Sequence, residues 1–374
     1  MDILVTGSNG FLAKNFIARL RLNNKIKILE FNRSTKKSLL ELYIKKAKLI
    51  FHFAAQNRSK RKKDFIINNI QLTKRICEII TKNNYKKKIV FSSSTQVSNK
   101  SIYGRTKLIC EQTILEASKN SKSNFFIFRI PNLFGKWSKP NYNSVVATFC
   151  YNIARNKKII VKNKKKLITF TYVDDLIDQF LEIIKYNYKK NNKKINFIKI
   201  KKIYKITTDQ LAKSLIFMKK NHNYFSLQKI NYDFLKKLYS TFVTFFPQKL
   251  ITYKLKKNID NRGNFSEFLK ADKFGQISYF SININKSRGG HYHHNKIEKF
   301  VFLTGKVKII YINILNNKKI TFTIAAGENK VIETLPGWSH LFKNIGNTKV
   351  FGIIWSNEVF DLAKPDTYKY DMNE

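Results

Sequence analysis

Several features are scarce in this sequence of 374 residues, and each absence excludes a class of protein. Only three cysteines occur, Cys77, Cys110 and Cys150, far apart and without a CxxC pair. This odd number predicts neither a disulfide framework nor a thiolate zinc site, and it favours a reducing compartment. No apolar run approaches the roughly 18 residues of a membrane span, and a strand pattern rather than a leader begins at Ile3. We therefore expect a soluble, cytoplasmic protein without membrane insertion.

Acidic residues are also few, since 24 Asp and Glu stand against 72 Lys and Arg and give a formal net charge of +48. Such a charge is typical of proteins that bind nucleic acid or anionic membranes. The lysines are scattered over every segment, however, without a Cys/His finger or an aromatic RNA-binding signature. We attribute the charge to codon bias in an AT-rich genome and expect no nucleic acid partner. A basic nucleic-acid-binding protein on a retired enzyme scaffold stays open, and salt-sensitive DNA binding without NADPH binding would favour it.

Length and hydrophobic content indicate two folded domains. The 374 residues are too many for one ordinary core, and 43% of them are hydrophobic and 14% aromatic. We expect a reductase domain with its substrate-binding part over residues 1–250 and a second domain over residues 258–370. The boundary between about 186 and 257 stays open, because that segment carries no readable chemistry; its stretch from Tyr224 to Phe246 looks partly helical and is assigned to the first domain.

The chain opens with a strand, a glycine-rich turn and a helix. Within DILVTGSNGFLA, which starts at Asp2, Gly7 suits a tight turn and Gly10 lets the backbone approach a pyrophosphate. The amino terminus of the following helix offers N–H groups to the anion. Ala13 stands where the usual motif has its third glycine. The turn predicts a dinucleotide site with these cofactor-binding residues: Gly7, Asn9, Gly10, Phe11 and Leu12.

The next two strands bear on the choice of cofactor. A strand from Ile26 to Phe31 leads to Arg33, whose guanidinium can hold a 2'-phosphate bidentately, which favours NADPH. Glu30 is the alternative, as an acid that would bind the ribose hydroxyls of NAD. A third, buried strand begins at Leu49 and ends in small residues at Ala54, which leaves room for the nicotinamide half.

A further strand, Ile89 to Ser94, ends in three serines and is followed by the run YGRTK. Tyr103 and Lys107 are four residues apart, so on a helix they share one face. An unperturbed tyrosine has a pKa of about 10, and we expect the Lys107 cation to stabilise the phenolate and also to bind the nicotinamide ribose. Ser94, with Ser93 as the fallback, is predicted to hold the substrate oxygen while hydride arrives from the cofactor and Tyr103 delivers the proton.

These residues resemble the extended short-chain dehydrogenase/reductase family of nucleotide-sugar enzymes. The segments RIPNLFG from Arg129 and YVDD from Tyr172 sit where that family has RxxNxYG-like and YVxD-like motifs, so the resemblance covers roughly residues 1–185. Phe134 replaces the usual tyrosine. The resemblance implies an α/β fold of the Rossmann type with a doubly wound parallel sheet. The catalytic set that it implies is Ser94, Tyr103 and Lys107.

From Asn258 onward, short strands alternate with Gly, Asn and Asp, a pattern typical of an antiparallel barrel or sandwich. The expected strands are Ile277 to Ile284, Phe300 to Ile314, Lys319 to Ala325, Val331 to Leu335 and Val350 to Trp355.

Histidines gather in this second half. On a strand, His291 and His293 would face the same side, because the side-chain period is two. Glu298 and His340 could complete a shell of three histidines and one carboxylate for Zn, Ni, Mn or Fe, and imidazole-rich ligation favours Zn. Whether such a metal is catalytic or structural stays open.

The histidine segments look like the two cupin motifs, HxHx(4)Ex(6)G and PxGxxHxxxN, with Leu335 at the proline position. This resemblance implies an all-β cupin, or jelly-roll, barrel after the reductase domain. The stretches RIPNLFGKWSKPNYNSVVATFCYNIARN, DNRGNFSEFLK, GHYHHNKIEKF and NEVFDLAKPDTY make the chain similar, nearly end to end, to the bifunctional CapF-type family of capsular polysaccharide synthesis.

The CapF-type resemblance implies two reactions on a UDP-sugar. The cupin would epimerise C3 of a UDP-4-keto-6-deoxy-N-acetylhexosamine, and the reductase would then reduce C4 with NADPH. The product would be UDP-2-acetamido-2,6-dideoxy-L-talose, on the route to UDP-N-acetyl-L-fucosamine. The family also implies a homo-oligomer, which we expect to be a dimer. The alternative is a monofunctional NAD(P)-dependent sugar-nucleotide reductase with a structural cupin.

Overall fold

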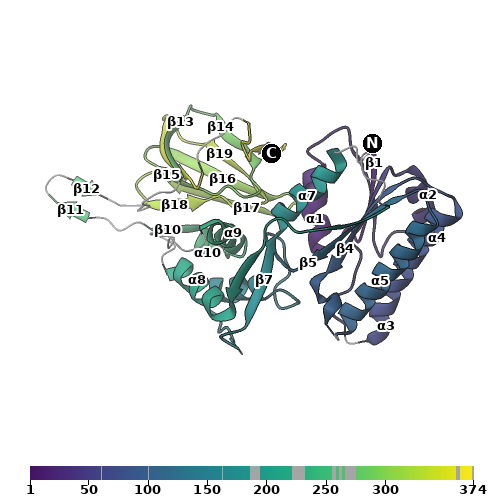
Figure 1. Cartoon of the computed structure of the whole chain (residues 1–374). Helices are drawn as coiled ribbons and strands as arrows, with labels where there is room; N and C mark the ends of the chain where they lie inside the picture. The colour runs from purple at the N-terminus through teal and green to yellow at the C-terminus, as the bar shows by residue number, and fades with distance from the viewer. Residues whose placement is uncertain are drawn as a thin grey trace. The chain divides into compact units, whose positions relative to one another are not determined.

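The computed structural model divides into two compact units (Figure 1). The first comprises residues 1–144 with 167–206, and the second comprises residues 145–166 with 207–374. The structure describes residues 1–59, 61–99, 101–161, 163–185, 194–220, 232–254, 258–260, 263–265, 275–358 and 363–372.

A parallel sheet of six strands in the order β2-β1-β3-β4-β5-β8 is the centre of the first unit. Its strands are β1 (Asp2–Thr6), β2 (Lys27–Phe31), β3 (Leu49–His52), β4 (Lys88–Ser94), β5 (Asn124–Ile130) and β8 (Ile195–Ile198). The strand order reverses between β1 and β3. In sheets of this kind, ligands bind at the carboxyl ends of the strands beside such a reversal.

Helices cover both faces of the sheet, as Figure 1 shows. On one face lie α1 (Phe11–Leu20) and α7 (Val173–Lys185), and on the other lie α2 (Leu39–Lys46), α4 (Leu72–Lys82) and α5 (Ile102–Lys119). Because both faces are buried, the strands are apolar almost throughout. The doubly wound α/β sheet is thus confirmed for the first unit.

Shorter elements complete the first unit. They are α3 (Lys62–Phe65), the π-helix η1 (Ile66–Gln71), the 3-10 helix η2 (Thr95–Ser98) and a small sheet of β6 (Asn132–Phe134), β7 (Leu167–Tyr172) and β9 (Tyr204–Thr207).

Two five-stranded antiparallel sheets dominate the second unit, in the orders β10-β18-β15-β20-β13 and β17-β16-β19-β14-β21. The first contains β10 (Thr252–Lys254), β13 (Gln276–Ile282), β15 (Glu298–Phe302), β18 (Lys330–Glu333) and β20 (Val350–Ser356). The second contains β14 (Ser287–Tyr292), β16 (Lys306–Asn313), β17 (Lys319–Ala325), β19 (Trp338–Asn344) and β21 (Tyr368–Lys369). Strands β11 (Asn258–Asp260) and β12 (Gly263–Phe265) pair antiparallel with each other. The helices of this unit are α6 (Val145–Ala154), α8 (Thr208–Lys220), α9 (Tyr232–Val243) and α10 (Gln248–Ile251).

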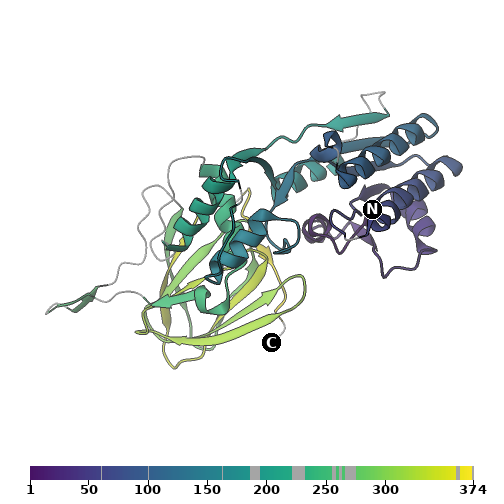
Figure 2. The ribbon, with the colours of Figure 1, turned by 90° about the horizontal axis from the view of Figure 1, so that it is seen from below.

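Aromatic side chains fill the space between the two sheets. The rings of Phe300 in β15 and Phe342 in β19 are 4.4 Å apart, and Phe280 lies 5.6 Å from Phe300. Gly352 makes room for Phe280, because an added Cβ would lie 2.2 Å from its ring. Figure 2 shows the long strands curving around this interior. The predicted domain of antiparallel sheets is therefore confirmed.

Most predicted strands of this unit are present, with one division. The expected strand from Phe300 to Ile314 is two strands, because Gly305 turns the chain with a φ of +78° between β15 and β16. Strand β14 ends at Tyr292, so His293 follows the strand rather than lying on it.

The chain before residue 258 contributes to the second unit. Strand β10 pairs antiparallel with β18, and the Ser240 hydroxyl on α9 donates to the Asn295 carbonyl at 3.0 Å. The boundaries of the compact units therefore differ from the domain boundaries 1–250 and 258–370 that the motifs predict. Those domain boundaries stay a prediction. Parts of the predicted segments lie outside the described residues, namely 186–193, 221–231, 255–257, 261–262, 266–274 and 359–362.

Within the described parts of the chain, no helix combines the length and the apolar character needed to cross a membrane.

Candidate functional site

The glycine-rich turn after β1 brings predicted cofactor residues together. Gly7 has a φ of +69°, and a Cβ there would lie 2.6 Å from the Cα of Ala54, so only glycine lets the turn approach the end of β3. Gly10 donates to the Gly7 carbonyl at 2.8 Å and precedes α1 without a side-chain cap. Phe11 and Leu12 then begin the helix, and Asn9 is exposed. The uncapped helix terminus can bind a pyrophosphate through its N–H groups.

The loop after β2 distinguishes the two candidates for ribose recognition. Arg33 is exposed and donates to the side-chain oxygen of Gln56, which follows β3, so it reaches across the carboxyl ends of β1 and β3. Glu30 lies within β2 and forms an ion pair with Arg21 at 2.9 Å. Asn32 donates to the Ser8 hydroxyl at 2.9 Å and so links this loop to the glycine turn. Arg33 therefore lies where a cofactor phosphate could bind, whereas the Glu30 carboxylate is held by Arg21.

The serines that end β4 have different partners. Ser93 donates to the buried carboxylate of Glu111, which also holds Arg129 at 2.7 Å. The Ser94 oxygen accepts from the Gln96 amide at 3.1 Å and caps η2, so its own proton can still be donated to a substrate. These contacts favour Ser94 over Ser93 as the substrate-binding hydroxyl.

Burial dominates the electrostatics of the YxxxK pair. The Lys107 side chain is 1% exposed, donates to the Ser92 carbonyl at 2.6 Å, and has its pKa lowered to about 8 by burial. Burial, with a smaller effect of Cys110, raises the pKa of Tyr103 to about 12. The effect of Lys107 on the Tyr103 phenolate stays a prediction. Tyr103 stays protonated at neutral pH, which is the form that a proton donor needs.

Two residues that the sequence analysis missed fix the position of this pair. Gly104 packs against η2 so closely that an added Cβ would lie 2.1 Å from the Gln96 carbonyl oxygen. The buried Asn69, in η1, exchanges hydrogen bonds with the Gln56 backbone and donates to the Thr106 hydroxyl at 3.1 Å. The YxxxK motif by itself does not indicate that the residue after the tyrosine must be glycine. A single asparagine such as Asn69 gives no sequence signal of its role.

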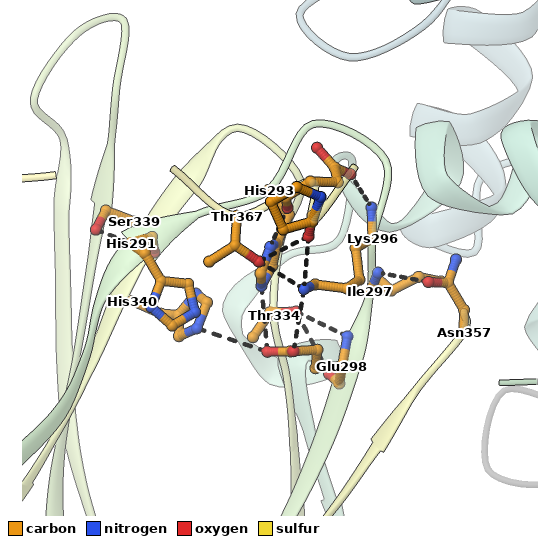
Figure 3. Close-up of polar contacts among 12 residues, drawn as sticks. His291, His293, Lys296, Ile297, Glu298, Thr334, Ser339, His340, Asn357 and Thr367 are labelled. Carbon is orange, nitrogen blue, oxygen red and sulfur yellow. Dashed lines mark hydrogen bonds and ion pairs between the residues drawn. The ribbon is translucent and has the colours of Figure 1, made fainter. Parts of the chain in front are cut away.

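Four predicted metal ligands meet in the second unit. The ligand atoms of His291, His293, Glu298 and His340 all lie within 4.8 Å of one another. Figure 3 shows the three imidazoles and the carboxylate gathered in one place. His291 comes from β14, Glu298 from the start of β15 and His340 from β19, so both sheets contribute to the cluster.

The protonation states of the cluster suit a divalent cation. Burial and the neighbouring histidines lower the pKa of His291 and lower that of His340 further. Burial raises the pKa of Glu298, but the nearby His293, Lys296 and His291 outweigh it, so the pKa falls overall. Neutral imidazoles and an ionised carboxylate are what a metal requires. Both ring nitrogens of His340 and Nε2 of His293 are buried without a hydrogen bond among the described residues, as expected of unused ligand atoms.

A cavity of about 230 Å³ adjoins this cluster and is lined by Glu298, Lys296, Arg288, Phe280, Phe300 and Ser356, among others. A neighbouring pocket of about 270 Å³ is lined by three cations, Lys286, Arg288 and Lys349, and by no acid among the residues that the structure describes. Arg288 lines both. The pair of hollows can hold a polar ring near the metal ligands and an anionic group beside it.

Comparison with known families agrees with this organisation. Residues 3–197 match the profile of the NAD dependent epimerase/dehydratase family, and residues 258–368 match the Polysaccharide biosynthesis C-terminal domain. A UDP-2-acetamido-2,6-beta-L-arabino-hexul-4-ose reductase of Pseudomonas aeruginosa is 34% identical over 374 residues, which is all of both chains.

Solved structures give the same result. The capsular polysaccharide assembling protein CapF from Staphylococcus aureus matches with a TM-score of 0.64 and 34% identity over 100% of both chains. A UDP-glucuronic acid 4-epimerase from Bacillus cereus, solved with NAD, matches with a TM-score of 0.53 and 18% identity over 59% of this chain and 83% of that one, a similarity of fold alone. The chain therefore belongs to the NAD dependent epimerase/dehydratase family and, within it, to the CapF-type extended short-chain dehydrogenase/reductase enzymes.

Proposed function

We propose that the chain converts a UDP-4-keto-6-deoxy-N-acetylhexosamine in two steps, by C3 epimerisation in the second unit and NADPH-dependent C4 reduction in the first. The product would be UDP-2-acetamido-2,6-dideoxy-L-talose, on the route to UDP-N-acetyl-L-fucosamine for capsule or O-antigen. The observation that carries the proposal is the presence in one chain of the Ser94, Tyr103 and Lys107 constellation and a four-ligand cluster. The full-length similarity to a hexul-4-ose reductase supports the same substrate class.

In the reduction, NADPH held by the glycine turn after β1 and by Arg33 would supply a hydride to C4 of the keto sugar. Ser94 donates a hydrogen bond to the C4 carbonyl oxygen, and Tyr103 transfers its proton to that oxygen as the negative charge develops. Hydride on carbon and a proton on oxygen would together give the alcohol and leave the cofactor oxidised. Lys107, one helix turn beyond Tyr103, keeps a cationic nitrogen at neutral pH, since its lowered pKa of about 8 still lies above 7.

Preference for NADPH is supported by Arg33, whose fork fits a 2'-phosphate. Glu30 of β2, the residue that would favour NAD, is already paired with Arg21, which follows α1. The glycine turn and the amino terminus of α1 would hold the pyrophosphate.

In the epimerisation, the C4 ketone makes the C3 proton acidic, and loss and return of that proton on opposite faces invert C3. A divalent metal, for which the imidazole-rich set best fits Zn, would be held by His291, His293, Glu298 and His340 and would supply positive charge to an enolate oxygen. Lys296, 3.9 Å from the Glu298 carboxylate, adds a second fixed positive charge at the cavity. Reduction at C4 then removes the ketone and traps the new configuration.

The substrate diphosphate is assigned to the pocket of Lys286, Arg288 and Lys349, from which the sugar would extend into the cavity beside Glu298. We also propose domains over 1–250 and 258–370, from the pattern of motifs and strands, and a homodimer, since the family implies a homo-oligomer.

The test is incubation of the purified full-length protein with NADPH and candidate UDP-4-keto sugars in D₂O, with NMR of the products. We expect NADPH oxidation and a product that carries deuterium at C3. Reduction without deuterium at C3 would instead favour the monofunctional reductase, and an absence of NADPH oxidation with every keto sugar would refute the reductase.

A further inference from the structure

We infer that Asp366, from the carboxy-terminal segment, is the positioning residue that holds the metal-binding loop in shape. The inference rests on the metal centre of the proposed function and concerns a residue outside the four-ligand cluster. The loop in question is residues 293–296, which follows β14, begins with the ligand His293 and leads to the ligand Glu298.

The Asp366 carboxylate accepts three backbone hydrogen bonds from this loop. Oδ1 accepts from the amide of His294 at 3.0 Å, and Oδ2 accepts from the amides of Asn295 and Lys296 at 2.7 Å each. Three successive N–H groups thus converge on one carboxylate, and charge-assisted bonds of this kind are among the stronger ones in proteins. The loop belongs to no helix or strand at these residues, so the carboxylate supplies the partners that a regular element would otherwise provide.

The Asp366 backbone acts on the ligand itself. Its carbonyl oxygen lies 2.7 Å from Nδ1 of His293. A carbonyl can only accept, so Nδ1 must carry the hydrogen, and this leaves the lone pair on Nε2. Nε2 is the nitrogen that faces Glu298, at 3.2 Å from its carboxylate. Asp366 therefore selects the tautomer of His293 that can bind a metal through Nε2.

The backbone of Asp366 is in the left-handed region, with a φ of +37°. A non-glycine residue adopts this conformation at some cost, and here it occurs where one residue presents both its side chain and its carbonyl to the same loop. The flanking residues add to the contact, because Lys296 Nζ donates to the Thr367 hydroxyl at 2.6 Å and to the Pro365 carbonyl at 3.2 Å.

Residues 365–367 thus fix the loop backbone, the His293 ring and the Lys296 ammonium from about seventy residues away. If this contact served folding alone, its loss would lower the free energy of unfolding equally with and without metal. If it positions the ligands, its loss must weaken metal binding by more than the loss of folding stability explains. It must also change the coordination sphere of the metal.

The experiment uses the full-length chain with Co²⁺ as the probe, titrated against a chelator while the visible absorption of bound Co²⁺ is recorded. Three variants are compared with the wild type: Asp366→Ala, Asp366→Asn, and Asp371→Ala as a matched control at an exposed aspartate of the same segment. Thermal melting of the metal-free proteins measures the purely structural effect.

We expect Asp366→Ala to weaken Co²⁺ binding and to alter the Co²⁺ spectrum. The affinity should fall by about 10- to 100-fold, which is the usual effect of losing a residue that hydrogen-bonds to a metal ligand. Asp366→Asn should fall between, since it keeps the side-chain shape and an acceptor oxygen but loses the charge. Asp371→Ala should match the wild type. Wild-type affinity and spectrum in folded Asp366→Asn would overturn the inference, even if Asp366→Ala fails to fold. A wild-type chain that binds no Co²⁺ would overturn the metal centre itself, and the inference with it.

Discussion

A methyl group added at Gly104 should separate catalysis from cofactor binding. In Gly104→Ala the new Cβ would lie 2.1 Å from the backbone oxygen of Gln96 and 3.0 Å from that of Asn99. Real Cβ atoms essentially never approach closer than 3.0 Å, so α5 and η2 must move apart by about 0.9 Å. Neither oxygen can rotate away, because both belong to the backbone. The displacement therefore falls on the start of α5, which carries Tyr103.

The expected magnitude follows from this displacement. A misplacement of about 1 Å at a reacting group can cost on the order of 100-fold in rate, which is about 2.7 kcal/mol of transition-state stabilisation. Overpacking costs about 1–3 kcal/mol of folding stability, offset by about 1 kcal/mol because alanine favours a helix more than glycine does. NADPH affinity should fall less than kcat, since the glycine turn after β1 is untouched and Lys107 lies one helix turn beyond Tyr103.

The assay is the rate of NADPH oxidation with the keto sugar, together with a fluorescence titration of NADPH binding and a thermal melt. Gln112→Ala, an exposed position on the same helix, is the control that adds an alanine without a clash. A folded Gly104→Ala enzyme with wild-type kcat would show that the spacing of α5 and η2 does not set the position of Tyr103.

Three further predictions concern charge. Arg33→Ala should weaken NADPH binding without changing NADH binding, and equal loss of both cofactors in titrations would rule out the 2'-phosphate assignment. Lys107→Met should remove the part of the pH dependence of folding stability that Lys107 contributes. The pKa of Lys107 is about 8 in the folded chain against 10.5 when exposed, so the unfolded chain binds more protons between these two values. The contribution of Lys107 to the free energy of unfolding therefore rises with pH by up to about 3 kcal/mol. Denaturant melts of both proteins from pH 7 to about 10.5 should therefore show a steeper rise for the wild type, and parallel curves would contradict the buried cation. Arg288→Ala should raise KM for the UDP-sugar in C3 exchange by roughly 10-fold or more and leave NADPH binding unchanged, and an unaltered KM would remove the diphosphate from its pocket.

Motifs with fixed spacing predicted the fold and which residues meet in the candidate metal cluster. The glycine turn, the strand ending in serines and the HxH segment each combine a local pattern with a chemical requirement, and the structure places Gly7 beside Ala54 and His291 beside His293. The prediction that His291 and His293 face the same side rested on the alternation of side chains along a strand, which does not fully explain their positions. A register shift lies between Gly289 and His291, and β14 ends at Tyr292, before His293.

Long-range contacts could not be predicted in this way. Asp366 meets its partners across some seventy residues, and Asn69 joins η1 to the YxxxK helix through a buried side chain. A single asparagine or aspartate has no periodicity to mark it, and its partners are defined only by the folded chain. The pKa of Tyr103 is hidden from the sequence for a related reason, since burial, which a sequence does not display, raises it.

The most direct test of the central claim, that one chain holds two separate reaction sites, is solvent deuterium exchange at C3 of the keto sugar in two opposite variants. Tyr103→Phe should still wash deuterium into C3 while losing C4 reduction, because its ring remains and only the transferable proton is gone. The double variant His291→Ala with His293→Ala should lose or weaken the exchange, because two of four ligands are removed. Undiminished exchange in a folded, metal-free double variant would contradict metal-dependent epimerisation, and exchange that vanished in Tyr103→Phe would place both reactions in the first unit.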